Sequence, residues 1–114
     1  MPVRYQIRLP DPSQARGGEP SLSFSAHGAE TFAEQLQDAL RTPVLFERWR
    51  AMQDEPDEVD PALGVTDSDA TVSGEQRDLS ITLVAVTSIP GDILQQRLRW
   101  LAGNRWELRN VSHV

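Results

Sequence analysis

The sequence contains no cysteine and no lysine, and all eleven of its basic residues are arginine. Without cysteine the chain can form neither disulfides nor thiolate metal sites, so packing must stabilise the fold and side-chain redox chemistry is excluded. No apolar run approaches the roughly 20 residues of a membrane-spanning helix, and the first residues alternate rather than form an apolar signal segment. We therefore expect a cytoplasmic protein that makes no contact with membranes.

Motifs for catalysis are also missing. The sequence has neither of the glycine-rich phosphate-binding patterns, G-x-x-x-x-G-K-[ST] and G-x-G-x-x-G. Its two histidines are poorly placed for acid–base chemistry, because His27 lies in a short turn and His113 is next to the last residue. Asp67 and Asp69 resemble the opening of a calcium-binding EF-hand loop, but the required glycine and final glutamate are not at their spacing. We therefore predict a non-enzymatic protein without a metal or other cofactor.

What the sequence does contain is enough apolar residues for one core. It has 114 residues, of which 39% are hydrophobic, and this predicts a single domain over residues 1–114. Two segments near residues 10–20 and 54–69 are rich in proline, glycine or acids and are predicted to be mobile loops, the first of them exposed. The formal net charge of -6 repels polyanions, which disfavours binding to duplex DNA or anionic lipid.

Apolar patterns predict five strands and three helices. Apolar and polar residues alternate along residues 3–9, as in a half-buried strand, whereas much of residues 79–87 is apolar on both faces, as in a central strand. The amphipathic pattern of residues 29–40 predicts a helix, and Thr42-Pro43 predicts the start of another. The predicted strands span residues 3–9, 22–26, 70–73, 79–87 and 105–111, with a turn at 74–78, and the predicted helices span residues 29–40, the segment after Pro43 and residues 93–102.

This order of elements predicts an α+β fold. Mostly antiparallel strands, together with helices that each carry one apolar stripe, favour a single sheet of four to five strands with the helices packed on one face. Two more specific arrangements fit this pattern. One is ferredoxin-like, and the other is a weak repeat of two strand-strand-helix units, suggested by a slight similarity of residues 22–40 to residues 83–101.

The second predicted helix carries an apolar stripe of Leu45, Phe46, Trp49 and Met52. We expect this stripe to pack into the core, with Trp49 as its largest member. The alternative is an exposed stripe around Phe46 and Trp49 that binds another protein. The run that follows, at residues 54–60, has five acids in seven residues, so we expect neither a helix nor a core contribution from it.

The arginines of the first and last predicted strands share one phase of the alternation. If helices cover the other face of the sheet, Arg4, Arg8, Arg105 and Arg109 point outward together. In a ferredoxin-like order these two strands are neighbours, so like charges would face each other and an anionic partner would relieve their repulsion. The alternative is that exposed arginines only keep the sheet soluble and prevent aggregation.

More arginines and two tryptophans gather towards the end of the sequence. Guanidinium and indole groups are used to hold phosphates and to stack on planar ligands. Trp100 and Trp106 nevertheless occupy apolar phases of their elements, which favours a core position for both. Arg97 lies on the apolar arc of its helix, where we expect it to reach past the core edge or to pair with a carboxylate rather than to touch a ligand.

These features favour a non-catalytic regulatory or adaptor module that binds another, unidentified protein. The alternative is a sensor of an anionic nucleotide second messenger, such as a cyclic dinucleotide, on an arginine-rich surface. The acidic run could also bind this surface within the same chain or in a neighbouring copy, so a homodimer stays open. The candidate binding residues are Arg4, Arg8, Arg97, Arg105, Arg109 and Trp106.

Overall fold

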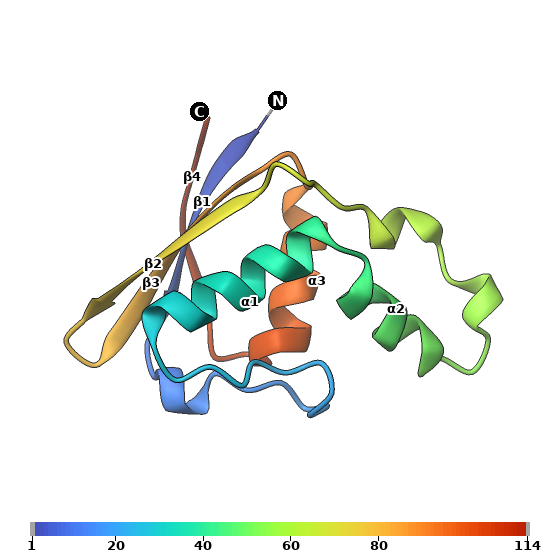
Figure 1. The fold of residues 1–114 in the computed structure, drawn as a ribbon, viewed down its shortest axis with the longest axis horizontal. Helices are drawn as coiled ribbons and strands as arrows, with labels where there is room; N and C mark the ends of the chain where they lie inside the picture. The colour runs from blue at the N-terminus through green and yellow to red at the C-terminus, as the bar shows by residue number, and fades with distance from the viewer. Residues whose placement is uncertain (1, 114) are drawn as a thin grey trace.

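Four antiparallel strands form one open sheet, and the described residues also form three α-helices (Figure 1). The structure is a computed structural model that describes residues 2–113. The strands are ordered β2-β3-β1-β4, and every neighbouring pair is antiparallel. The elements are β1 (Val3–Leu9), α1 (Ala29–Arg41), α2 (Val44–Ala51), β2 (Thr71–Arg77), β3 (Ser80–Thr87), α3 (Gly91–Ala102) and β4 (Glu107–His113). The α+β prediction is confirmed, while the finer assignment to a ferredoxin-like fold stays a prediction.

One face of the sheet is buried beneath α1 and α3, which lie on the same side of it (Figure 1). Side chains of β1 and β3 alternate between this buried face and the opposite face, where they are half-buried or exposed. The predicted single-sided covering of the sheet is thus present. The core side chains from the strands are Tyr5, Ile7, Leu9, Ile81, Leu83 and Ala85, and those from the helices include Phe32, Leu36, Leu40, Leu94 and Leu98.

The strand predicted at residues 22–26 is wrong, although its alternation is real. Leu22, Phe24 and Ala26 are buried as they would be in a strand. The backbone, however, runs along the end of α3, where the Phe24 N–H donates to the Leu101 carbonyl (2.8 Å). This segment therefore satisfies the free carbonyls of a helix end instead of joining the sheet. The first strand-strand-helix unit of the predicted repeat does not form in the described part of the chain.

The segment 10–20 packs against the same end of α3. Ala15 is fully buried, and Gly17 approaches the Trp100 carbonyl so closely that any Cβ there would collide with it. A glycine is required at this contact because two backbones meet. The predicted exposure of the segment is therefore wrong for Ala15, and its mobility stays a prediction.

Strands β2 and β3 form a hairpin with a shorter turn than the predicted 74–78. β2 continues to Arg77, and Asp78 then adopts a left-handed conformation with φ of 54°, which aspartate tolerates in hairpin turns. Gly74 lies inside β2 instead of in the turn. The Ala29 carbonyl of α1 approaches it too closely for a side chain, so this glycine allows α1 to lie on the sheet.

Candidate functional site

Charge is divided unevenly between two parts of the protein. Residues 44–69, which comprise α2 and the segment leading to β2, are called the acidic arm, and the rest of the chain is called the body. The acidic arm holds eight of the 17 acidic residues and two of the eleven arginines, which gives it a net charge of -6. The body has nine acids and nine arginines and is neutral. The acidic arm therefore carries the whole formal charge of the protein.

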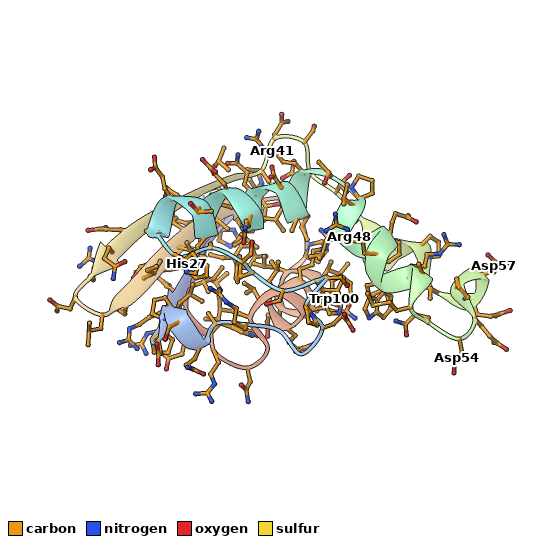
Figure 2. All side chains as sticks on the ribbon, turned by 60° about the horizontal axis from the view of Figure 1, so that its bottom comes forward. His27, Arg41, Arg48, Asp54, Asp57 and Trp100 are labelled. Carbon is orange, nitrogen blue, oxygen red and sulfur yellow. The ribbon has the colours of Figure 1, made fainter. Side chains whose placement is uncertain are left out.

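The acidic arm projects from the end of the molecule that lies away from the β2–β3 hairpin (Figure 1). Contrary to the prediction that its acidic run forms no helix, Pro56–Glu58 and Pro61–Gly64 adopt short 3-10 turns. Arg50 organises this part, because its Nε donates to the Pro56 carbonyl (2.9 Å) and its guanidinium pairs with Asp57 (3.5 Å). Figure 2 shows Asp54 and Asp57 at the outer end of the arm. Their carboxylates are presented at the tip of a folded segment.

Aromatic side chains attach the acidic arm to the body. Trp49 of α2 stacks on Trp100 of α3, with ring centroids 4.9 Å apart and an angle of 24° between the planes. Phe46 lies 6.1 Å from Trp49, and Gly64 lies against the Phe46 ring so tightly that a Cβ would come within 2.6 Å of it. Aromatic pairs of this kind stabilise by about 0.5–1.5 kcal/mol beyond the area they bury.

The apolar stripe predicted for α2 is only partly in the core. Leu45 and Phe46 are buried, as expected, and Trp49 is half-buried against the core. Met52 is exposed, so its predicted core position is wrong, because α2 ends just before it. Trp49 is therefore a contact between arm and body rather than an interior residue.

Arg97 of α3 also connects the two parts. Its side chain is 1% exposed, and it donates to the carbonyls of Ala39 at the end of α1 (3.4 Å) and of Leu63 (3.0 Å) and Val65 in the acidic arm. Burial lowers the pKa of the Arg97 guanidinium, because the charged form loses its hydration. We expected Arg97 to pair with a carboxylate or to extend past the core edge. Both predictions are wrong, because backbone carbonyls bind its guanidinium. Arg97 therefore joins the arm to the body through hydrogen bonds.

Asp67 fixes the point at which the acidic arm rejoins the body. One of its carboxylate oxygens accepts from the Thr87 hydroxyl (2.9 Å) and the Ser88 N–H (2.9 Å), and the other accepts from the Asp69 N–H (3.0 Å). The Ser88 N–H, helped by these other donors, holds the pKa of the Asp67 carboxyl below its usual value despite partial burial. Asp67 therefore ends the arm with a charged hydrogen-bonding cluster rather than with a metal-binding loop.

The outward arginines of the sheet do not repel one another as predicted. β1 and β4 are neighbours, but Arg8 lies opposite Glu107, and Arg109, two residues further along β4, pairs with the same carboxylate. Arg8 and Arg109 pair with Glu107 Oε1 at 3.3 Å and 3.2 Å. Arg4 lies on the same face and makes no ion pair within residues 2–113. One acid thus neutralises part of this surface.

The remaining candidate residues lie apart from that face. Arg105 is exposed but precedes β4, and the indole N–H of Trp106 donates to the Gly103 carbonyl (2.9 Å) while its ring packs against the core. Arg97 is buried, as described above. The structure therefore brings together Arg4, Arg8 and Arg109 of the six candidates, and places the other three elsewhere.

Within residues 2–113, no ion pair joins the acidic run to these arginines. Of the ion pairs within the described residues, the one that involves residues 54–60 joins Asp57 to Arg50. The predicted contact within one chain is thus not formed, and a contact with a neighbouring copy stays a prediction.

Neither histidine lies in the core. His27 and His113 are both exposed, and no group of three His, Asp or Glu side chains in this part is placed to hold a metal ion. Tyr5 is buried, which raises the pKa of its hydroxyl with a further contribution from Asp92, and this hydroxyl donates to the Ile89 carbonyl (3.3 Å). No helix in the described residues is long and apolar enough to cross a membrane.

The acidic arm also carries exposed apolar side chains. The sequence patterns did not predict this exposure. Three of the five large exposed hydrophobic residues in the described part of the chain lie on the arm, namely Val44, Met52 and Val65. The other two, Leu79 and Val111, lie at a hairpin tip and on the edge strand β4. The signal in the sequence is the proximity of Met52 and Val65 to the acidic run.

No protein-family model, curated protein or solved structure matches this chain. Function is therefore inferred from the charge, burial and geometry of its own residues.

Proposed function

We propose that this protein is a non-catalytic binding module that docks a cationic protein partner on its acidic arm. One observation supports the proposal. The projecting arm carries the whole net charge of -6 and three of the five large exposed hydrophobic side chains in residues 2–113. Protein interfaces combine apolar contacts with complementary charge around them. The acidic arm offers both to a partner that carries lysine or arginine beside apolar residues.

The structure of the acidic arm supports docking because much of its shape is already set. Arg97, the stack of Trp49 on Trp100 and the contacts of Arg50 hold the arm before any partner binds. A surface that needs little ordering on association loses less conformational entropy and binds more tightly for the same contacts. The concentrated charge would also steer a cationic partner towards this end of the molecule.

An anionic nucleotide on the sheet is the second candidate function. Arg4 supports it, because its guanidinium makes no ion pair within residues 2–113. Glu107 weakens it, because this carboxylate already pairs with Arg8 and Arg109. A titration with a cyclic dinucleotide, followed by amide shifts of β1 and β4, tests this alternative directly.

The first experiment locates the partner. A photo-crosslinking residue replaces Met52 on the acidic arm or, as a matched control, the exposed Leu79 on the body, in the cells from which the sequence comes. We expect a specific cross-linked protein from position 52 and none from position 79. Cross-linking at position 79 alone would overturn the proposal.

The second experiment measures affinity with the purified partner. An arm variant carries Asp54→Asn, Glu55→Gln, Asp57→Asn and Glu58→Gln, and a body variant carries the same number of neutralised exposed acids: Asp11→Asn, Glu19→Gln, Glu30→Gln and Glu34→Gln. Since each exposed ion pair is worth about 0.2–1 kcal/mol, the arm variant should bind roughly ten-fold more weakly. The body variant should bind within about two-fold of the native chain. Equal losses in both variants would contradict docking on the arm.

A further inference from the structure

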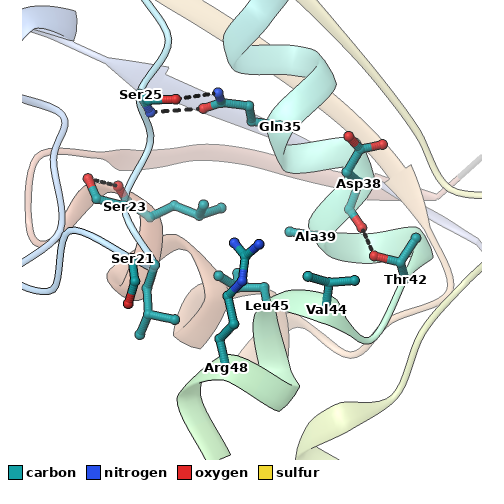
Figure 3. Close-up of a pocket in the computed structure, with 12 residues that line it drawn as sticks. Ser21, Ser23, Ser25, Gln35, Asp38, Ala39, Thr42, Val44, Leu45 and Arg48 are labelled. Atoms are coloured by element: carbon teal, nitrogen blue, oxygen red, sulfur yellow. Dashed lines mark hydrogen bonds between the residues drawn. The ribbon is translucent and has the colours of Figure 1, made fainter. Parts of the chain in front are cut away.

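A groove of about 530 Å³ lies beside the acidic arm, between the segment 21–25, α1, the start of α2 and the end of α3 (Figure 3). Its apolar lining includes the half-exposed Val44 and the edges of Leu22, Leu45 and Leu101, which are otherwise buried. Its volume falls within the roughly 300–1,000 Å³ that is usual for small-molecule sites. An apolar floor of this size would release water when a ligand with an apolar body binds.

Two opposite charges line this groove without neutralising each other. Arg48 reaches into it from α2, and Asp38 borders it from α1 (Figure 3). The ion pairs within residues 2–113 include neither side chain, and the hydrogen bonds there include neither the guanidinium nor the carboxylate. Arg50, two residues along the same helix, does pair with Asp57. The groove therefore presents one free cation and one free anion.

The polar rim of the groove is partly fixed by internal bonds. The Ser25 N–H donates to Gln35 Oε1 (3.1 Å), and Gln35 Nε2 donates to Ser25 Oγ (2.8 Å), which ties the segment 21–25 to α1. Thr42 Oγ1 donates to the Asp38 carbonyl (2.9 Å) and leaves the Asp38 carboxylate free. A ligand would thus meet a groove whose walls are already joined.

We propose that this groove binds a small zwitterion with an apolar body, namely a free amino acid or a very short peptide with free termini. Arg48 is suited to the ligand carboxylate, because a guanidinium matches a carboxylate with two parallel hydrogen bonds. Asp38 is suited to the ligand ammonium. Leu22, Leu45 and Leu101 contact the apolar side chain. A polyanion does not fit, because Asp38 repels it. The groove shares Val44 with the apolar surface of the arm, whereas the acids of residues 54–60 do not line it.

Binding is tested by two-dimensional amide NMR on the full chain. The probes are L-leucine, L-phenylalanine and the dipeptide Leu-Leu, compared with N-acetyl-L-leucine, which lacks the ammonium, and L-leucinamide, which lacks the carboxylate. We expect saturable shifts at Ser25, Ala39 and Leu101, and about a two- to five-fold weaker affinity when either charge is blocked. The longer dipeptide separates the two sources, because its charges lie further apart. Absence of saturable shifts at the groove for all three zwitterions would overturn the proposal.

Variants of Arg48 and Asp38 then test which end of the ligand each side chain binds. Arg48→Gln should abolish the preference for leucine over leucinamide, and Asp38→Asn should abolish the preference for leucine over N-acetyl-leucine. Matched controls on the same helix or a neighbouring one are Glu34→Gln and Arg99→Gln, which are exposed and lie outside the groove. Circular dichroism and melting curves verify that all four variants fold. If both preferences survive in the groove variants, or vanish equally in the controls, the two charges do not form the site.

Discussion

The body and the acidic arm are stabilised in different ways. The body buries the large aliphatic and aromatic side chains of its sheet and of α1 and α3, and its positive and negative charges balance. The arm contributes Leu45 and Phe46 to the buried residues and carries all the net charge. It is held by Arg97, by one stack of indole rings and by the hydrogen bonds of Asp67. Such a division lets the arm vary its surface while the body keeps the fold.

The largest loss of stability should come from removing the hydrogen bonds by which Arg97 joins the arm to the body. Arg97→Met retains the length of the side chain but leaves the carbonyls of Ala39, Leu63 and Val65 without their donor. Because hydrogen bonds to a buried charge are worth about 1.5–3 kcal/mol and unpaired carbonyls add a penalty, we expect a loss of about 3 kcal/mol in urea unfolding. Arg99→Met, one exposed position on the same helix, should change stability by less than about 0.5 kcal/mol. A loss below about 1 kcal/mol at Arg97 would show that the arm is held elsewhere.

Removing the aromatic contact should have the next largest effect and should act mainly on the arm. Trp49→Ala deletes the stack on Trp100 and should lower stability by about 2 kcal/mol, less than for a fully buried tryptophan because Trp49 is half-exposed. Hydrogen exchange should accelerate at Leu63 and Val65 before it accelerates in β3. Met52→Ala, its exposed counterpart, should leave both unchanged. Uniform acceleration throughout the protein would mean that arm and body unfold as one unit.

Acid should weaken the junction at Asp67. Its pKa is lower in the folded state than the ordinary value of 3.8, so its carboxylate stabilises the fold above that value, and this is lost as pH falls through the folded pKa. Asp67→Asn should lower stability by about 1 kcal/mol at pH 7, with the difference shrinking towards pH 2. Melting curves of both proteins between pH 2 and 7, with Asp69→Asn as control, measure this. A difference that is constant across this range would rule out titration of Asp67 as the cause.

Replacing the outer end of the arm should affect folding least. An uncharged linker of equal length in place of residues 54–60 removes few apolar contacts, so stability should change by less than about 1 kcal/mol. The same variant should lose binding of the cationic partner. Loss of cooperative unfolding would show that the 3-10 turns of the arm are needed for the body to fold.

Sequence patterns predicted the body better than the arm. Period-two alternation located β1 because this strand buries one face, and a run that is apolar on both faces located β3. Alternation at residues 22–26 reports the same one-sided burial with a different backbone partner. A period-two pattern shows that one face of a segment is buried. It does not show whether the backbone pairs with a neighbouring strand or with the carbonyls at the end of α3. The position of Arg97 on an apolar arc was readable, whereas its three carbonyl partners depend on contacts far apart in the sequence.

The candidate sites were predictable only in part for the same reason. The outward direction of Arg4 and Arg8 follows from the alternation of β1. The alternation of β4 also places Glu107 and Arg109 on one face, whereas the position of Glu107 opposite Arg8 depends on the register between β1 and β4, which no pattern in the sequence shows. The groove between Asp38 and Arg48 likewise depends on how α2 turns away from α1. Charge composition, by contrast, could have located the acidic arm from the sequence alone.

The stacked indoles of Trp49 and Trp100 also give the protein an optical property. Two stacked chromophores at this separation couple their electronic transitions, so the pair should contribute a characteristic near-ultraviolet circular dichroism signal. Trp106 lies between α3 and β4 and forms no aromatic pair within the described residues. Any event that lifts α2 from α3 uncouples the two transitions. The position of the arm can therefore be followed in solution without a label, through the light absorbed by two of the three tryptophans.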